Sequence, residues 1–321
     1  MKLPFAGLVA AVAFCGTALA QYPTRPITLI VPFAAGGPTD VLARTIGISM
    51  GKTLGTTVVI ENKVGAGGTI AANYVAKAAP DGYTIFLHHN GMATAVGLYR
   101  KLAYDPLKDF EYIGQVADVP MTLLARKDFP ANNLQELIKY TKGNEDKINL
   151  ANAGLGAVSH LCGMMFQQAI GQKWTTVPFS GTGPAMTALL GGQVDILCDQ
   201  TTQTLPIIRA DKVRFYGVTT KQRISSLPDA PTLNEQGLKD FEVIVWHGMY
   251  APKGTPSEAI GKLNNALRVA LKDPATASRL KDLGAEIVPE SKQTSEGLRT
   301  WLQSEIDKWV PVIRAAGTFA D

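Results

Sequence analysis

The sequence predicts an α/β fold organised as two lobes. Apolar runs typical of β-strands alternate with segments of helical apolar spacing along most of the chain, a pattern that favours largely parallel sheets covered by helices. The chain has 321 residues, and a length of about 300 exceeds what one hydrophobic core usually organises. No linker rich in Pro, Gly or Ser divides the chain, so we expect strands that cross between the lobes to join them.

Many turns between the predicted elements are rich in glycine and proline, such as Pro80-Asp81-Gly82. Strands are predicted at residues 27–31, 57–60, 84–87, 112–116, 122–125, 148–151, 175–178, 194–199, 214–218 and 243–250. Helices are predicted at residues 134–141, 160–170, 185–190, 205–210, 256–271, 274–283 and 296–315. The crossings are expected near Leu123 and Glu242, so residues 21–122 and 242–321 would form the first lobe and residues 123–241 the second.

The first twenty residues have the features of a secretory signal peptide. Lys2 supplies a positive charge before an apolar run, and Ala18-Leu19-Ala20 is a cleavage signal, so we expect cleavage after Ala20. Later in the sequence no run of about 18 uncharged apolar residues occurs, which argues against a membrane-spanning helix. Export would take the mature chain into an oxidising compartment.

Composition and motifs argue against several classes of function. The 31 Lys and Arg residues nearly balance the 27 Asp and Glu residues. Because no basic run carries interleaved aromatics, nucleic acid is not expected as a partner. Gly65-Ala66-Gly67-Gly68 is only a fragment of the dinucleotide fingerprint, and no complete P-loop or nucleophile elbow occurs, so we predict no cofactor and no catalytic residue.

Two cysteines, Cys162 and Cys198, remain after cleavage. Cys162 lies on a predicted helix and Cys198 at the end of the strand that follows it. Neighbouring elements of one βαβ unit can bring two cysteines within reach of a disulfide, and two separate buried thiols are the alternative. Two cysteines at this spacing match no metal motif, so no metal site is predicted.

The most informative segment is the strand-to-helix turn at residues 27–40. An apolar run ends in Pro32, Phe33 and four small residues follow, and Pro38 suits the first position of a helix, where its missing N–H costs nothing. Glycine lets the backbone N–H groups of a helix start approach a ligand, and the positive end of the helix dipole favours an anion. A cradle for a carboxylate or phosphate and an ordinary tight turn are both compatible with this pattern.

Two later turns share the pattern. In residues 152–161 two glycines precede Ser159 and His160 at a predicted helix start, where Ser159 would act as N-cap or first-turn hydroxyl. On the simpler alternative, Ser159 only caps the helix and His160 packs below it. In residues 177–185 the series Pro-Phe-Ser-Gly-Thr-Gly-Pro closely parallels residues 32–38. This recurrence favours anion binding over accidental packing.

Polar side chains follow two further predicted strands. Because ligands of open α/β sheets lie outside the carboxyl ends of the strands, His89, Asn90 and Asp199 are candidates to face the cleft, and an ordinary surface loop is the alternative. Ser159 and His160 are adjacent on one helix and point in different directions, so they cannot pair as nucleophile and base. These segments therefore indicate binding and not catalysis.

A series of motifs runs along essentially the whole mature chain. They are Tyr22-Pro23 to Ile27, Val31-Pro32-Phe33 with Ala35-Gly36-Gly37 and Asp40, Asn62 with Gly65-Ala66-Gly67-Gly68, Pro80-Asp81-Gly82-Tyr83-Thr84, Tyr104-Asp105-Pro106 with Lys108-Asp109-Phe110, Gly154 to Leu161, Leu190-Gly191-Gly192-Gln193-Val194-Asp195, Pro231-Thr232 with Glu235 and Gly237, and Trp246 with Ala251-Pro252 and Gly254-Thr255-Pro256. Together they resemble the substrate-binding proteins of tripartite tricarboxylate transporters, the Bug family.

The resemblance implies a periplasmic, two-lobed Venus-flytrap protein that binds a small mono- or dicarboxylate in the cleft between its lobes. It would act as a monomer, without catalysis, and deliver the ligand to the membrane subunits of a transporter. Family members hold carboxylates through backbone N–H groups, hydroxyls and waters at the turns. Carried over residue by residue, the site would comprise Phe33, Ala35, Gly36, Gly37, Thr39 and Asp40 from the first lobe and Gly156, Ala157, Ser159, His160, Ser180, Gly181 and Thr182 from the second, joined by His89, Asn90 and Asp199.

Some alternatives stay open in the sequence. The family commonly carries Ser or Thr where this chain has Ala157, so one hydroxyl contact is either missing or supplied by Ser159. His88, Met92 and Trp246 are candidates to contact the far end of the ligand, and Trp246 is equally compatible with a place in the core. The alternatives to a transport receptor are a secreted α/β hydrolase-like enzyme and a sensory protein that presents its ligand to a membrane partner.

Overall fold

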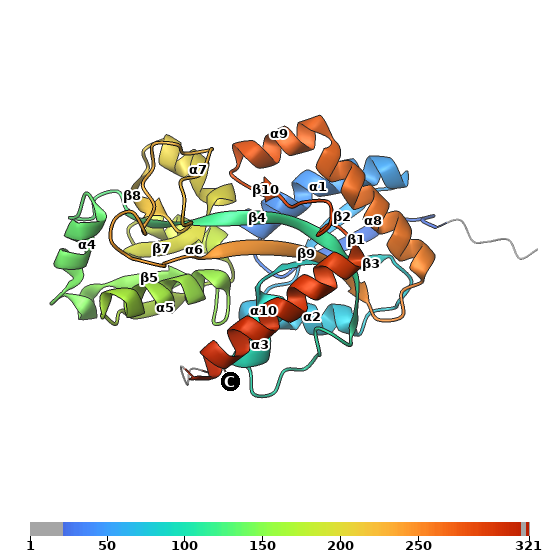
Figure 1. The fold of residues 1–321 in the computed structure, drawn as a ribbon, viewed down its shortest axis with the longest axis horizontal. Helices are drawn as coiled ribbons and strands as arrows, with labels where there is room; N and C mark the ends of the chain where they lie inside the picture. Colours follow the sequence, from blue (N-terminus) through green and yellow to red (C-terminus); the bar gives the residue numbers. More distant parts are fainter. Residues whose placement is uncertain (1–21, 316–318, 321) are drawn as a thin grey trace, which may run out of the picture.

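The computed structural model describes residues 22–315 and 319–320, and the expected signal peptide with its cleavage after Ala20 lies outside these residues. The described strands form one ten-stranded sheet with the order β2-β1-β3-β9-β4-β7-β5-β6, to which β8 and β10 add by pairing with β4 (Figure 1). The strands are β1 (Ile27–Val31), β2 (Val58–Asn62), β3 (Thr84–His89), β4 (Phe110–Arg126), β5 (Asn149–Asn152), β6 (Thr175–Pro178), β7 (Ile196–Gln200), β8 (Val213–Val218), β9 (Ile244–Pro252) and β10 (Glu286–Ile287).

Helices cover the sheet, and within residues 22–315 none of them is long and apolar enough to cross a bilayer. They are α1 (Pro38–Leu54), α2 (Thr69–Ala76), α3 (Gly91–Leu98), α4 (Leu134–Thr141), α5 (Val158–Ile170), α6 (Thr182–Leu190), α7 (Thr201–Arg209), α8 (Ser257–Lys272), α9 (Pro274–Asp282) and α10 (Ser295–Ala315), with short 3-10 turns η1 (Ala66–Gly68) and η2 (Glu145–Lys147).

Local signals explain where several helices begin and end. α1 ends at Gly55, whose φ of 67° is a left-handed conformation that glycine adopts without strain. The Asn133 side chain accepts a hydrogen bond from the Glu136 N–H at 2.9 Å, and Asp273 caps α9 in the same way. The structure accordingly has α4 and the three C-terminal helices close to their predicted bounds.

The long strand β4 corrects the sequence prediction. The sequence predicts two strands, residues 112–116 and 122–125, where the structure has one strand of 17 residues. Asp118 and Pro120 interrupt the apolar pattern, yet the backbone stays extended because β9 pairs with it as far as Pro120. From Met121 onward the same strand pairs with β7 and β8. One strand therefore belongs to both halves of the sheet.

The sheet is also less parallel than the sequence predicts. Strands β1, β2 and β3 run parallel to one another, and so do β5, β6 and β7. In contrast, β4 and β9 run antiparallel to each other and to their other neighbours. The alternation of strands and helices in the sequence predicts the parallel strands at the two ends of the sheet. It gives no information about the direction of β4 and β9, which cross between the lobes.

The two-lobed arrangement is visible in Figure 1, where β4 and β9 run through the middle of the molecule. Helices α4 to α7 gather around one end and α1, α2, α3, α8, α9 and α10 around the other. Because β4 changes partners between Pro120 and Met121, we propose that residues 21–122 and 242–321 form one lobe and residues 123–241 the other.

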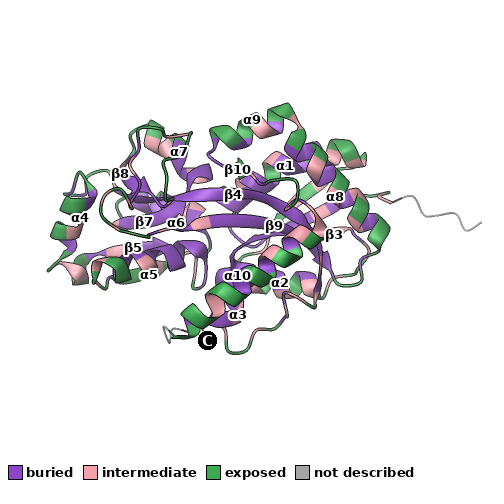
Figure 2. Ribbon diagram, in the orientation of Figure 1, coloured by how far each residue is buried: buried purple, intermediate pink, exposed green. Residues whose placement is uncertain are grey.

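The core is continuous through both lobes. Figure 2 shows the central strands as buried, with exposed residues mainly on the outer helix faces. Val119, Met121 and Leu123 of β4 belong to one apolar cluster that reaches from Leu29 on β1 to Leu150 on β5. Because burying one such side chain contributes about 1.5–3 kcal/mol, this cluster holds the crossing strand firmly between the lobes.

Candidate ligand-binding site

The turns singled out in the sequence meet at a small cavity between the two lobes. Its volume is about 20 Å³, room for about one water molecule. Residues from both lobes and from β4 form the wall. Of the predicted site residues, Phe33, Thr39, His89, Ala157, Ser159, Thr182 and Asp199 line it, and Pro38, Met121, Ala153, Val158 and Gln200 complete it.

Four helices begin at this wall. Pro38 opens α1, Val158 opens α5, Thr182 opens α6, and Gln200 immediately precedes α7. The first N–H groups of a helix lack partners within the helix, and each helix dipole places about half a positive charge at this end. None of the described wall residues is Lys or Arg. The positive potential of the cavity therefore comes from the backbone, and it favours an anion.

Several predicted residues form the contact between the lobes instead of the cavity wall. The Ala34 N–H donates a hydrogen bond to the Ser180 carbonyl at 3.2 Å. A Cβ atom on Gly181 would lie only 2.9 Å from Ala34 N, so glycine is needed for this close approach of two backbones. Like Asp40, Asn90 and His160, the following predicted site residues do not line the cavity: Ala35, Gly36, Gly37, Gly156, Ser180 and Gly181.

Asn90 and His160 also lie outside the wall, because their side chains bind other parts of the protein. Asn90 Nδ2 donates to the Ile244 carbonyl and the Trp246 N–H donates to Asn90 Oδ1, both at 3.0 Å. This side chain therefore fastens the start of α3 to β9. The Gly156 N–H donates to His160 Nδ1 at 3.3 Å, which fixes the turn before α5.

Ser159 lies in the first turn of α5, and the N-cap position belongs to Ala157. The Ala153 N–H donates to Ser159 Oγ at 2.9 Å. Because Oγ acts as acceptor in this bond, the hydroxyl proton stays available to a ligand in the cavity. Ser159 thus supplies a donor at the place where Ala157 has none.

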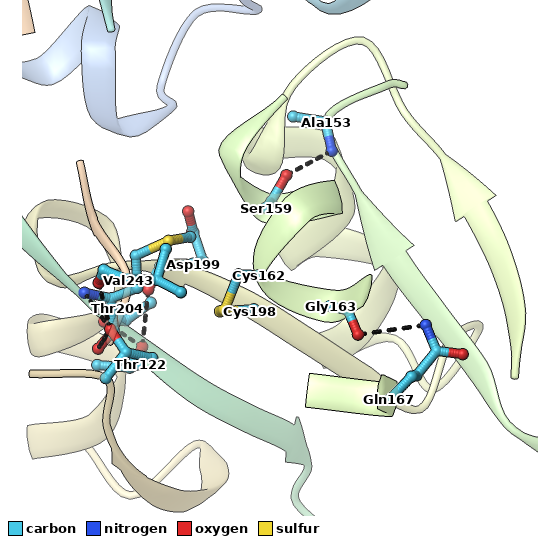
Figure 3. The surroundings of a disulfide bond; sticks show 12 residues. Thr122, Ala153, Ser159, Cys162, Gly163, Gln167, Cys198, Asp199, Thr204 and Val243 are labelled. Atoms are coloured by element: carbon cyan, nitrogen blue, oxygen red, sulfur yellow. Dashed lines mark hydrogen bonds between the residues drawn. A yellow bond between two sulfur atoms is a disulfide. The ribbon is translucent and has the colours of Figure 1, made fainter. Parts of the chain in front are cut away.

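A disulfide joins two elements of the wall. Cys162, one turn beyond Ser159 on α5, is bonded to Cys198 on β7, directly before Asp199 (Figure 3). The two Cα atoms are 6.2 Å apart, within the range usual for disulfides. Both cysteines are buried. The bond therefore fixes the distance between the first turn of α5 and the end of β7.

His89 is the histidine that reaches the wall. The Gly91 N–H donates to its Nδ1 at 3.0 Å, and the ring stacks on Phe33 with centroids 4.8 Å apart. Burial lowers the pKa of His89 to about 3, so the ring is neutral at pH 7. Because Nδ1 accepts a hydrogen bond, the proton of the neutral ring lies on Nε2, which makes this atom a donor.

His247 is a neighbour of the site that sequence reasoning missed. It is fully buried on β9, and its Nε2 lies 3.3 Å from the Thr39 hydroxyl of the wall. Met121 was missed as well, because it comes from the middle of β4 and not from a turn. The other additions, such as Gln200 and Pro38, lie within segments that the sequence had already singled out.

The three candidates for the far end of the ligand lie outside the wall. His88 and Met92 are fully buried in the first lobe. Trp246 donates its indole N–H to Glu305 at 2.9 Å, which places this ring in the core below α10. Among the described residues, no group of His, Cys, Asp and Glu is arranged to hold a metal ion.

Asp199 is the acidic side chain of the wall, and it is fully buried at the end of β7. Burial raises its pKa to about 7, against smaller opposing interactions with the Gln200 N–H and the Thr182 hydroxyl. A carboxyl group in such surroundings changes its charge near neutral pH. It is therefore sensitive to any charge or hydrogen-bond donor that enters the cavity.

Asp40 shapes the first turn without lining the cavity. Its carboxylate accepts hydrogen bonds from the Gly36 N–H at 2.9 Å, from Arg44 Nε at 2.8 Å and from Asn62 Nδ2 at 2.9 Å. Burial alone would raise the pKa of Asp40, but the bonds from Arg44, Gly36 and Asn62 outweigh it and hold the pKa below its usual value. Asp40 thus acts as the anchor of this turn.

We expect Asp40→Asn to lower the free energy of unfolding at pH 7 by about 1.5–3 kcal/mol, the range for a hydrogen bond to a charged group. Because the folded-state pKa is depressed, this contribution is present above the unfolded pKa of about 3.9 and is lost as the pH falls through the folded value. Urea unfolding at pH 7 and pH 3 should therefore show a smaller difference between variant and wild type at pH 3. Asp211→Asn, on the surface, is the matched control; an equal effect there would contradict the role of Asp40.

The fold and the cavity define a class of protein, the two-lobed periplasmic binding proteins, and solved structures agree. The chain superposes on the periplasmic binding protein BugD with a TM-score of 0.91 at 52% identity, covering 93% of this chain and 99% of that one. MatC (Rpa3494) from Rhodopseudomonas palustris, solved with bound malate, gives a TM-score of 0.87 at 44% identity, covering 91% of this chain and 100% of that one.

Sequence comparison identifies the family. The family model for the tripartite tricarboxylate transporter family receptor matches residues 42–318. A protein encoded in the TAR-I ttuE-ttuC' intergenic region of Agrobacterium vitis is 48% identical over 297 residues, 92% of this chain and 86% of the relative. The chain belongs to the tripartite tricarboxylate transporter receptor family, which confirms the resemblance seen in the motifs.

Proposed function

We propose that this chain is a periplasmic receptor that captures a small mono- or dicarboxylate between its lobes and delivers it to the membrane subunits of a tripartite tricarboxylate-type transporter. The observation that carries the proposal is the convergence of four helix N-termini on the cavity between the lobes. Family membership supports the receptor role, and the malate bound to MatC supports a carboxylate ligand. The expected signal peptide supports a periplasmic location.

Energetics support an anion held without a salt bridge. A buried carboxylate must be compensated by protein groups, because its hydration is lost. A hydrogen bond to a charged group contributes about 1.5–3 kcal/mol, and a well-placed helix N-terminus up to about 2 kcal/mol. The hydroxyl of Ser159 and Nε2–H of His89 add two side-chain donors to the backbone N–H groups. Together these donors can compensate for the lost hydration of one or two carboxylates.

The size of the cavity implies a movement. A volume of about 20 Å³ is far below that of a dicarboxylate, so the lobes must separate for a ligand to enter. Separation breaks the direct contact between Ala34 and Ser180 and exposes the helix N-termini of both lobes. Each lobe then offers only part of the ligand shell, which couples binding to closure. We propose that the protein does this as a monomer.

The site supports a binding protein better than a hydrolase. A secreted enzyme that used His160, His89 and Asp199 would need an imidazole base near the cavity, but His160 lies outside the wall and the pKa of His89 is about 3. The histidine that reaches the wall is thus a poor proton acceptor at pH 7. A sensory role would use the same ligand site with another membrane partner, and the family match favours transport.

A thermal-shift screen tests the proposal. At a concentration of one hundred times Kd, a ligand that binds only the folded state adds about 2.7 kcal/mol, which corresponds to an increase in Tm of about 4 °C for a chain of about 300 residues. We expect such an increase for at least one acid among aliphatic dicarboxylates, amino-acid dicarboxylates and aromatic acids, recovered unchanged by NMR. If no acid raises Tm, or if the acid is turned over, the proposal is wrong.

A further inference from the structure

The junction between β7 and α7 presents buried acceptors that have no donor. Asp199 is 0% exposed and Gln200 is 6% exposed, and both line the cavity. Neither carboxyl oxygen of Asp199 nor Oε1 of Gln200 accepts a well-formed hydrogen bond among the described residues. The Gln200 N–H and the Thr182 hydroxyl lie near enough to affect the pKa of Asp199, but the Thr182 hydroxyl donates to Gln203 instead. A buried acceptor without a partner is destabilising. These three atoms are therefore suited to receive donors from a molecule in the cavity.

The rest of the cavity wall carries hydrogen-bond donors. The helix starts at Thr39, Val158 and Thr182 contribute N–H groups, and Ser159 and His89 contribute an O–H and an N–H. These groups match the oxygen atoms of a carboxylate. The cavity thus has a donor side that fits an acid and an acceptor side that fits something else.

A plain dicarboxylate matches the acceptor side only when Asp199 is protonated. Its oxygens would face those of Asp199, and two carboxylates in contact repel each other unless one of them takes up a proton. A hydroxyl or an ammonium group on the ligand would instead donate to Asp199 and complete the hydrogen bonding of the wall. Because an ammonium is positively charged, its bond to a carboxylate is the stronger of the two.

We propose that Asp199 is the specificity-determining residue of the site and accepts a hydrogen bond from a hydroxyl or ammonium group carried by the carboxylate ligand. The inference rests on the proposed function, because it assumes that a carboxylate occupies the donor side. Gln200 Oε1, in the adjacent residue, is a second acceptor for the same hydroxyl or ammonium group. The ligand class is accordingly a hydroxy- or amino-carboxylic acid, in preference to the acid that lacks the substituent.

Isothermal titration with three four-carbon acids tests the inference. Succinate, L-malate and L-aspartate share two carboxylates and differ only in having hydrogen, hydroxyl or ammonium at one carbon. We expect the wild type to bind malate or aspartate at least about tenfold more tightly than succinate. In Asp199→Ala this preference should fall to within about threefold, because the acceptor is gone.

Asp199→Asn separates the two donors. The amide oxygen still accepts from a hydroxyl, so the preference for malate should largely persist, whereas the preference for aspartate should fall at least about tenfold because the charge is lost. Asp211→Asn, with an exposed side chain that pairs with Lys127 and does not line the cavity, should leave all three affinities unchanged. Circular dichroism and the unfolding midpoint verify that each variant is folded, and the near-isosteric Asn variant still tests the inference if the Ala variant does not fold.

The outcomes distinguish this inference from the proposed function. If the wild type binds all three acids equally, or if both Asp199 variants keep every preference, the inference is wrong and the receptor role stands. If the screen finds another plain acid, the same comparison is made with that acid and its 2-hydroxy and 2-amino derivatives. If no acid binds in either assay, the proposed function fails and the inference with it.

Discussion

Replacing Gly67 by Ala is expected to weaken ligand binding at least about tenfold, the effect of adding about 1.4 kcal/mol to the cost of closure. Gly67 lies in η1 of the first lobe with a φ of +61°, and a Cβ atom there would collide with the carbonyl oxygen of Leu155, in the turn before α5. This carbonyl is backbone and cannot rotate away. The added methyl group would therefore hold the two lobes apart in the arrangement that surrounds the cavity.

Gly55→Ala is the matched control for this variant. Gly55 has a similar φ of +67°, but a Cβ atom there meets no described atom within 4 Å. Both substitutions should cost about 1–2 kcal/mol of stability, because an L-residue is strained in the left-handed region. Only Gly67→Ala should change the affinity, measured by titration with the best acid of the screen. Equal affinities for the two variants would show that the contact at Leu155 does not matter for binding.

Removal of the disulfide is expected to have the largest effect on stability. The bond between Cys162 and Cys198 closes a loop with a sequence separation of 36, and disulfides of this kind typically contribute about 2–4 kcal/mol. The double variant Cys162→Ala with Cys198→Ala avoids a reactive free thiol. We expect its free energy of unfolding in urea to be lower by this amount, and its affinity to fall as well, since the bond fixes α5 against β7.

A reductant provides the control for this experiment. Reduction should shift the unfolding midpoint of the wild type towards that of the double variant, and it should leave the variant unchanged. This comparison separates the cross-link from the loss of two buried sulfur atoms, which costs stability through packing alone. If reduction leaves the wild-type midpoint in place, the disulfide does not stabilise the fold.

The elements that the sequence predicts most accurately are those determined by residues within one short segment. The strand at residues 27–31 and the helix at residues 134–141 have their predicted bounds, because an apolar run and a capping residue act within a few positions. The strand β4 depends on partners more than a hundred residues away, and β10, with Glu286 and Ile287 alone, is too short to have a pattern. Pairing over such separations leaves no local signal.

The same distinction holds for the candidate site. The turns singled out by the strand-to-helix pattern contribute Phe33, Thr39 and Ser159 to the cavity wall, and their role in ligand binding stays a prediction. For Asn90 the sequence gives only a polar residue at a strand end, and its two bonds to β9 lie 154 and 156 positions away along the chain. A polar residue after a strand can thus serve a ligand or a neighbouring strand, and only the assembled fold decides which.

The uninterrupted course of β4 through both lobes has a further consequence. A protein whose halves are tethered by loose linkers can be cut into pieces that fold separately, and each half then melts independently. Here the backbone of one half continues into the hydrogen-bonded ladder of the other, and both share one apolar cluster. The lobes should therefore unfold as a single cooperative unit. Amide protons in the middle of β4 should exchange with solvent as slowly as any in the molecule.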